Sequence, residues 1–264
     1  MAPSGTAGLT PGAQVETRDV TIRFGGHVAV DAVSCAFHSG SLTAIVGPNG
    51  AGKTTYFNLI SGQLRAFAGQ VYLRGEDITR YSAPVRTRKG IGRAFQLTNL
   101  FPNLTVIENV RLAVQAAAGE GLDMRVPWQR RAALIDEAEE ILARVNLTSR
   151  AAVLAATLPH GDQRKLEVAM LISLKPSVFM FDEPTAVMSL DEAPVILDLI
   201  RAIKAEGDKT VLLVEHKMEV VRSLADRIVV LHNGQLIADG APAEVMASSI
   251  VQEAYLGTGG GGHD

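Results

Sequence analysis

The segment at residues 47–55 carries the strongest chemical signal in the chain. It reads GPNGAGKTT and fits the phosphate-binding pattern G-x-x-x-x-G-K-[ST]. Its glycines let backbone N–H groups turn toward a polyphosphate, and the N-terminus of a following helix adds positive potential. Lys53 is expected to reach the β- and γ-phosphates, and the Thr54 hydroxyl to ligate Mg²⁺. The residues expected to bind the nucleotide in this segment are Gly47, Pro48, Asn49, Gly50, Ala51, Gly52, Lys53, Thr54 and Thr55.

The flanks of this segment distinguish a nucleotide site from a chance match on a glycine-rich surface turn. A β-rich run, Leu42 to Gly47, comes directly before it, and the helical pattern YFNLISGQL comes directly after it. A strand, a phosphate loop and a helix in this order form the context in which the pattern binds phosphates. The sequence therefore predicts a nucleotide site here.

Two acidic residues end an apolar run later in the chain. Residues 178–184 read VFMFDEP. If this run is a strand parallel to the one before the phosphate loop, Asp182 is placed to help hold Mg²⁺ and Glu183 to orient a water opposite the leaving diphosphate. The alternative is a strand followed by an ordinary proline-containing turn, which the phosphate loop in the same chain disfavours.

A histidine and a glutamine could complete the chemistry. His216 ends the run TVLLVEH, at the side of a parallel sheet where ligands bind, and its neutral imidazole could hydrogen-bond the γ-phosphate. Gln96, in the stretch IGRAFQ, could reach the metal or the attacking water through its amide. The expected catalytic set is Lys53, Gln96, Glu183 and His216, and the expected metal ligands are Thr54, Gln96 and Asp182.

Short β-rich runs and helical patterns would position these residues. The β-rich runs are Val20 to Phe24, Leu42 to Gly47, Gln70 to Gly75, Ser177 to Asp182, Thr210 to Glu215 and Arg227 to His232. Near-continuous apolar runs are typical of a parallel sheet covered on both faces, whereas the more alternating early runs and the Asn233-Gly234 pair predict an antiparallel fringe. Helices are predicted over Trp128 to Val145, Gln163 to Leu174 and Glu192 to Glu206. The fold class is α/β, with residues 97–174 forming a helical insertion.

The composition is that of an ordinary globular chain. Of 264 residues, 47% are hydrophobic and 20% charged, with a net charge of −3, which excludes wholesale disorder and gives no sign of nucleic-acid binding. A single cysteine, Cys35, cannot form an internal disulfide and fits a reducing compartment. No run approaches the roughly 18 apolar residues of a membrane-spanning helix, and residues 1–14 do not read as a signal peptide. We expect flexible tails at 1–14 and 258–264, and a cytoplasmic protein that meets a membrane through a partner.

Taken in order, these motifs resemble the ATP-binding subunit of an ABC transporter, and the resemblance covers Val15 to Gly257. The landmarks of that family are an aromatic that stacks on adenine, the Walker A loop, the Q-loop glutamine, the signature segment, the Walker B strand, the D-loop and the switch histidine. They fall, in that order, on Phe24, residues 47–55, Gln96, Leu158 to Ala169, residues 178–184, residues 185–192 and His216.

The resemblance implies a fold, a reaction and partners. The fold is a P-loop NTPase (RecA-like) core in a single domain at 15–257, with residues 97–174 as a helical subdomain that docks on integral membrane permease subunits. The reaction is hydrolysis of MgATP at the interface of two ATP-binding subunits, in a homodimer or a heterodimer. The signature of one subunit completes the ATP site of the other, and its nucleotide-contacting residues are Leu158, His160, Gly161 and Asp162. A solute-binding protein outside the cell belongs to such a system, no nucleic acid does, and the chain sits peripherally on the inner face of the membrane.

Within that family the chain resembles the longer ATPase of branched-chain amino acid importers. The stretches that carry this likeness are residues 23–34, 91–110, 161–164, 214–221 and 251–257. Related systems transport amides or urea, so the solute stays open.

Two motifs depart from the family pattern. In the signature, Pro159 replaces the usual serine and has neither a hydroxyl nor a backbone N–H, while Gly161 and a helix N-terminus remain to bind phosphate. In the D-loop, Ser189 replaces the usual aspartate and Val187 stands where a small residue is typical. These changes put the contacts across the dimer in doubt and leave this chain's own Walker residues intact.

Other classes of protein fit the sequence less well. A small-molecule kinase would share the phosphate loop, but it has no need of the segment LPHGDQRKLE before the Walker B strand. A GTPase would need an N-K-x-D motif, which is absent. An ABC ATPase that acts on ribosomes or nucleic acid is the better rival, although such proteins usually fuse two ATPase units or insert long coiled coils.

Overall fold

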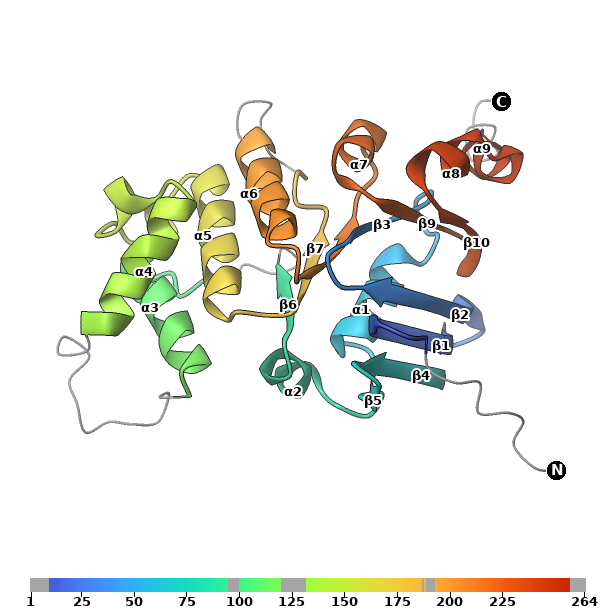
Figure 1. The fold of residues 1–264 in the computed structure, drawn as a ribbon, viewed down its shortest axis with the longest axis horizontal. Helices are drawn as coiled ribbons and strands as arrows, with labels where there is room; N and C mark the ends of the chain where they lie inside the picture. Colours follow the sequence, from blue (N-terminus) through green and yellow to red (C-terminus); the bar gives the residue numbers. More distant parts are fainter. Residues whose placement is uncertain (1–9, 95–99, 120–131, 187, 189–192, 257–264) are drawn as a thin grey trace.

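A mostly parallel sheet forms the centre of the computed structural model, which describes residues 10–94, 100–119, 132–186, 188 and 193–256 (Figure 1). Its strands lie in the order β10 (Gln235–Gly240), β9 (Arg227–His232), β3 (Leu42–Val46), β8 (Thr210–Val214), β7 (Val178–Asp182) and β6 (Ile91–Ala94). Neighbours from β9 to β6 are parallel, and β10 is antiparallel to β9. Every residue of β3, β7 and β8 is buried, as in a sheet covered on both faces. The predicted α/β class is confirmed.

The predicted antiparallel fringe is also confirmed. A second sheet has the order β2 (His27–His38), β1 (Ala13–Phe24), β4 (Ala68–Leu73) and β5 (Glu76–Asp77), with antiparallel neighbours. The hairpin between β9 and β10 turns at Asn233 and Gly234, whose φ angles are 49° and 79°; two positive φ values are what a tight hairpin with right-handed strand twist requires. One boundary is corrected: β1 begins at Ala13, inside the expected tail at 1–14.

Helix α1 (Lys53–Ser61) connects the two sheets. It starts directly after the phosphate loop, and its Tyr56, Phe57, Leu59 and Ile60 are buried in one apolar cluster with strands of both sheets. The end of α1 is held by Arg86 of α2 (Ala83–Arg88), whose Nη1 donates to the carbonyl oxygens of Leu59 and Ile60 at 2.7 Å each. The helix that follows the phosphate loop is therefore held by apolar packing along one side and by Arg86 at its C-terminal end.

The helical insertion lies at one end of the molecule (Figure 1). Its described helices are α3 (Val106–Ala117), α4 (Ala132–Arg144), α5 (His160–Ser173) and the short 3₁₀ turns η2 (Thr148–Arg150) and η3 (Ala155–Thr157). Helix α3 begins with a capping box, in which Thr105 accepts from the Glu108 N–H and the Glu108 carboxylate accepts from the Thr105 N–H. Residues 128–131 of the helix predicted over 128–145 lie outside the described residues.

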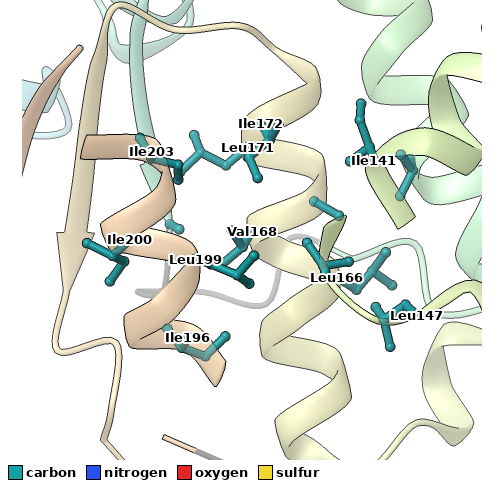
Figure 2. Packing of buried hydrophobic residues seen from close by; sticks show 14 of the residues in the cluster. Ile141, Leu147, Leu166, Val168, Leu171, Ile172, Ile196, Leu199, Ile200 and Ile203 are labelled. Atoms are coloured by element: carbon teal, nitrogen blue, oxygen red, sulfur yellow. The ribbon is translucent and has the colours of Figure 1, made fainter. Parts of the chain in front are cut away.

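Helix α6 (Ala193–Ala205) joins the insertion to the sheet. Figure 2 shows Leu199 of α6 facing Val168 of α5 and Ile200 on the opposite side of α6, with Ile141 and Leu147 on the other side of α5. Beyond the sheet lie α7 (Met218–Leu224), α8 (Pro242–Ala247) and α9 (Ser249–Leu256), which pack on β9 and β10. Within the described part of the chain, no helix is long and apolar enough to cross a membrane.

Candidate functional site

The phosphate loop follows β3 and passes close to neighbouring backbone. Gly47 has φ of 149°, and a Cβ there would lie 2.1 Å from the Leu231 carbonyl oxygen. Gly52 has φ of 94°, and a Cβ there would lie 2.4 Å from the Ala29 carbonyl oxygen. A side chain at either position would collide with backbone, so glycine is required for the loop to pack between β2 and β9.

A groove of about 400 Å³ opens beside this loop. It is lined by Phe24, His27, Ala29, residues 49–55 and Glu183. The Phe24 side chain is 50% exposed at the groove, although it is apolar and aromatic. The structure thus brings the predicted adenine-stacking residue, the phosphate loop and the predicted catalytic glutamate to one surface.

Lys53 lies at the base of the loop. Its Nζ donates to the carbonyl oxygens of Gly47 at 2.8 Å and Pro48 at 2.9 Å, and the residue is only 8% exposed. Burial lowers the pKa of this ammonium, whereas the charges of Glu183 and Asp182 act to raise it. The positive charge is therefore held under the loop and close to both carboxylates.

Asp182 ends β7 and is paired with an arginine. Its Oδ2 accepts from Nη2 of Arg93, on neighbouring β6, at 2.7 Å, and the two side chains are 4% and 8% exposed. Burial raises the pKa of the Asp182 carboxyl, and the Arg93 charge opposes this shift. Arg93 also donates to Asn58 and Ser61, which lie on α1. The carboxylate is thereby linked to the helix that follows the phosphate loop.

Glu183 and His216 follow adjacent strands and face each other. His216 Nδ1 lies 3.9 Å from Glu183 Oε1, and the two side chains are 51% and 44% exposed. The Glu183 backbone has φ of 49°, a left-handed conformation that costs a residue with a Cβ about 1–2 kcal/mol. Its N–H donates to the Val214 carbonyl oxygen on β8 at 2.9 Å. A strained backbone held by the next strand thus aims the glutamate into the groove.

The donor set suits Mg²⁺ held jointly by protein and nucleotide. Thr54 lines the groove, and Asp182 lies close enough to Lys53 for the two charges to interact. Among the residues that the structure describes, no three His, Cys, Asp or Glu side chains form a metal-binding group. Mg²⁺ commonly binds through one or two protein oxygens together with phosphates and water. A hydroxyl, a carboxylate and a polyphosphate therefore match this ion.

The predicted signature residues occupy a different place. Pro159 is the N-cap of α5 and makes no side-chain capping bond, which agrees with its lack of a hydroxyl and an N–H. His160 is exposed, Gly161 is buried and Asp162 pairs with Lys165 at 2.7 Å. None of the described residues that line the groove comes from this segment. The chain's own signature does not join its own phosphate loop.

Two residues of the site, Arg93 and His27, were not predicted from the sequence. Gln96, Val187 and Ser189 lie outside the described residues. Arg93 was missed although a charge inside a short, otherwise small and apolar strand is a detectable signal. His27 was missed because no local pattern marks a histidine at the first residue of a strand as part of a groove.

The fold and the site define a phosphate-loop nucleotide-binding protein with acidic residues at the carboxyl ends of parallel strands. This chain belongs to the ABC transporter family: residues 30–186 match the family described as ABC transporter, and residues 235–260 match a family described as branched-chain amino acid ATP-binding cassette transporter. Its class is the ATP-binding, ATP-hydrolysing subunit, and the predicted resemblance is confirmed.

Named relatives agree with this assignment. The chain is 37% identical to the high-affinity branched-chain amino acid transport ATP-binding protein BraF of Pseudomonas aeruginosa, with 92% of this chain and 97% of BraF covered. It is 35% identical to the corresponding protein LivG of Escherichia coli, with coverages of 89% and 94%. The crystal structure of the ADP conformation of MJ1267, an ATP-binding cassette of an ABC transporter, superposes with a TM-score of 0.79 at 29% identity, over 93% of this chain and 99% of that one.

Proposed function

We propose that the chain binds MgATP in the groove beside residues 47–55 and is one ATPase subunit of a branched-chain amino acid importer. Lys53 and the loop N–H groups hold the phosphates, and Thr54 and Asp182 hold the ion. The bound ion would neutralise phosphate charge that develops during transfer. The observation that carries the nucleotide assignment is the groove itself, which Phe24, the phosphate loop and Glu183 share.

The hydrolytic step falls to two residues on adjacent loops. Glu183 orients the attacking water and accepts its proton, and His216 donates a hydrogen bond to the γ-phosphate. The distance of 3.9 Å between the two side chains allows both to meet the reacting group. Gln96 is expected to contact the same ion or water. Because phosphoryl transfer leaves little covalent work to the protein, positioning and charge supply most of the catalysis.

A second ATPase subunit completes each site. The signature residues Leu158, His160, Gly161 and Asp162 lie at or just before the start of α5 and outside the described lining of the groove. His160 is exposed there, so this end of the helix can meet the nucleotide of a partner. The partner is a second copy of this chain or a different, shorter ATPase. ATP drives closure because it binds the closed pair better than the open one.

The names of the relatives supply the solute class, and the resemblance to ABC importers implies the remaining partners. BraF and LivG are named for high-affinity transport of branched-chain amino acids, and we carry that solute class to this chain. The helical insertion docks on integral membrane permease subunits, and a solute-binding protein delivers the amino acid from outside. The chain then works in the cytoplasm, on the inner face of the membrane.

Hydrolysis of MgATP by the purified chain tests the enzymatic part. We expect the rate per subunit to rise with protein concentration if two copies complete each other's sites, and to vanish in Glu183→Gln while ATP still binds. A flat, near-zero rate with ATP bound would indicate that the signature contacts come from a different subunit. An unchanged rate in Glu183→Gln would refute the role of Glu183.

Uptake by cells tests the transport part. A strain of the source organism lacking this gene is expected to take up radiolabelled leucine, isoleucine and valine more slowly. Wild-type protein should restore uptake and Glu183→Gln should not. Loss of amide or urea uptake with normal amino-acid uptake would reassign the solute, and unchanged transport of every solute would favour the non-transport alternative.

A further inference from the structure

Glu215 is a buried carboxylate to which the proposed reaction assigns no role. It directly follows β8, immediately before His216 in the sequence, and is 0% exposed. Its Oε2 accepts from the backbone N–H of His216 at 2.8 Å and of Lys217 at 3.0 Å. A buried charge is costly unless it is hydrogen-bonded, so these contacts fix the backbone that carries His216.

The other oxygen of Glu215 reaches the loop that follows β7. Oε1 accepts from the hydroxyl of Thr185 at 2.5 Å, and Thr185 is itself 1% exposed. In a second contact Thr185 is the acceptor: Lys217 Nζ donates to the Thr185 carbonyl oxygen at 3.3 Å. The loops after β7 and β8 are thus joined by one buried and one outer bond.

Thr185 lies two residues after Glu183, inside a tight turn. The Ala186 N–H donates to the Glu183 carbonyl oxygen at 3.0 Å, and Glu183 has a φ of 49°. A left-handed residue with a Cβ persists only where its surroundings hold it. The Thr185–Glu215 bond is one such restraint, because it fixes the far end of the turn to the adjacent strand.

The same carboxylate is close to the histidine ring. His216 Nδ1 lies 3.7 Å from Glu215 Oε2 and 3.9 Å from Glu183 Oε1. Neither separation is a hydrogen bond, so the Glu215 carboxylate acts on His216 through its backbone N–H rather than through its ring. Glu215 therefore contacts the Glu183 turn through Thr185 and the His216 segment through its backbone.

We propose that Glu215 and Thr185 are positioning residues for hydrolysis: their buried hydrogen bond keeps Glu183 and His216 at the spacing that the reaction requires. This inference rests on the roles proposed above for Glu183 and His216. It predicts that breaking the bond lowers the rate of hydrolysis and leaves the binding of ATP nearly unchanged, because neither residue is among the described residues that line the groove.

The test compares isosteric variants of the full chain, assayed with whichever second subunit supports hydrolysis. Thr185→Val removes the hydroxyl and keeps the shape, Thr185→Ser keeps the hydroxyl, and Glu215→Gln removes the charge. We expect Thr185→Val and Glu215→Gln to lower kcat about 10- to 100-fold, the scale of a misplaced reacting group. The Kd for a fluorescent ATP analogue should change less than about threefold, and Thr185→Ser should keep kcat within about threefold of wild type.

Two controls separate positioning from general damage. Thr210 is also a fully buried threonine with a bonded hydroxyl, but it lies at the opposite end of β8, where its Oγ1 donates to the His38 carbonyl oxygen at 3.1 Å. Thr210→Val should leave kcat unchanged. The double variant Thr185→Val/Glu215→Gln should be less slow than the product of the two single effects, because both changes act on the same hydrogen-bonded pair.

Each alternative result overturns the inference. It is wrong if Thr185→Ser is as slow as Thr185→Val, if Thr210→Val slows hydrolysis equally, or if Kd rises in step with the loss of kcat. If Glu215→Gln does not fold, the Thr185 pair of variants decides by itself. Glu183→Gln, run beside them, tests the proposed function separately: an active Glu183→Gln refutes the role of Glu183, whatever the Thr185 variants show.

Discussion

Replacing Arg93 by methionine should destabilise the protein strongly, because it leaves the Asp182 carboxylate buried without its cation. The pair is 2.7 Å apart and the two side chains are 8% and 4% exposed. Arg93 also donates to Asn58 Oδ1 at 2.5 Å, Ser61 Oγ at 3.0 Å and Gln63 Oε1 at 2.9 Å. The substitution therefore removes these bonds, which join β6, β7 and the region of α1.

The magnitude follows from the burial of the pair. Removing one partner of a buried ion pair costs about 3–5 kcal/mol. Asp182 can escape part of this cost by taking up a proton, since burial already raises its pKa, so we expect about 3 kcal/mol at neutral pH. For a chain of this length about 2–3 °C accompanies each kcal/mol, which gives a fall in Tm of about 6–9 °C.

Thermal unfolding followed by circular dichroism measures this effect, and an exposed pair supplies the control. Lys89 and Glu76 are 2.8 Å apart but 32% and 47% exposed, and such pairs contribute about 0–1 kcal/mol. Lys89→Met should therefore lower Tm by no more than about 3 °C. The reasoning is refuted if Arg93→Met costs no more than Lys89→Met.

Acid and a second substitution test the cause. Below the pKa of Asp182 the carboxyl is neutral and needs no cation, so the deficit of Arg93→Met relative to wild type should shrink as pH falls and be largest at neutral pH. Adding Asp182→Asn to Arg93→Met should recover part of the lost stability, because the orphaned charge is gone. A deficit that is independent of pH and unrelieved by Asp182→Asn would mean that lost packing, rather than charge, dominates.

Three further predictions concern other parts of the chain. Thr105→Ala should lower the free energy of unfolding by about 1 kcal/mol by removing the cap of α3. Bonds from Thr105 lower the pKa of the folded Glu108 carboxyl, so the stability that they contribute is present above the pKa of unfolded Glu108 and is lost as pH falls through its folded pKa. Urea unfolding should therefore show a smaller deficit of Thr105→Ala near pH 3 than at neutral pH. Burial raises the pKa of the Cys35 thiol to about 12, so iodoacetamide at pH 8 should leave the native thiol unmodified and alkylate it in urea, as mass spectrometry would show. Pro159→Ser should raise the rate of ATP hydrolysis per subunit by supplying a hydroxyl and an N–H at the start of α5, with Tm nearly unchanged because the gained cap of about 1 kcal/mol offsets the greater entropy of the unfolded chain.

The central strands and the phosphate loop were predictable because their signals are local. The buried runs of β3, β7 and β8 are short and apolar. The glycine, lysine and threonine residues of the phosphate loop occur at a fixed spacing that predicts phosphate binding. The hairpin at Asn233 was predictable for the same reason, because an adjacent asparagine and glycine favour the two positive φ angles of a tight turn.

Other elements depend on contacts that are distant in sequence. Strand β6 is only four residues long and contains Gly92 and Arg93, a composition that does not favour a strand. A Cβ at Gly92 would lie 2.4 Å from Leu171 and 2.8 Å from Pro176, so the glycine is explained by the packing of the segment around α5 and not by its own neighbours. Arg86 is 2% exposed, and nothing in its local sequence marks it as the cap of α1.

The same distinction holds within the site. Lys53, Asp182, Glu183 and His216 were identified from the motifs that contain them, and each motif lies within a few residues of the chain. Arg93 is 89 residues from Asp182, and Thr185 is 30 residues from Glu215. A hydrogen bond between such residues forms only when the sheet brings their strands together. The sequence therefore shows the donor and the acceptor but does not indicate that they are partners.

The sheet alone does not explain how Glu183 and His216 come to face each other. Strand order places β8 between β3 and β7, so the loops after these strands begin about 5 Å apart, but a loop that starts at the right place can still point in many directions. Buried polar groups remove that freedom because each one is costly to leave unbonded. If the loop after β7 moved, the carboxylate of Glu215 would lose the Thr185 hydroxyl, and if the loop after β8 moved, it would lose two N–H donors. The two loops are therefore most stable when both are in place, and the geometry of the reacting side chains is determined by residues that need not touch the nucleotide.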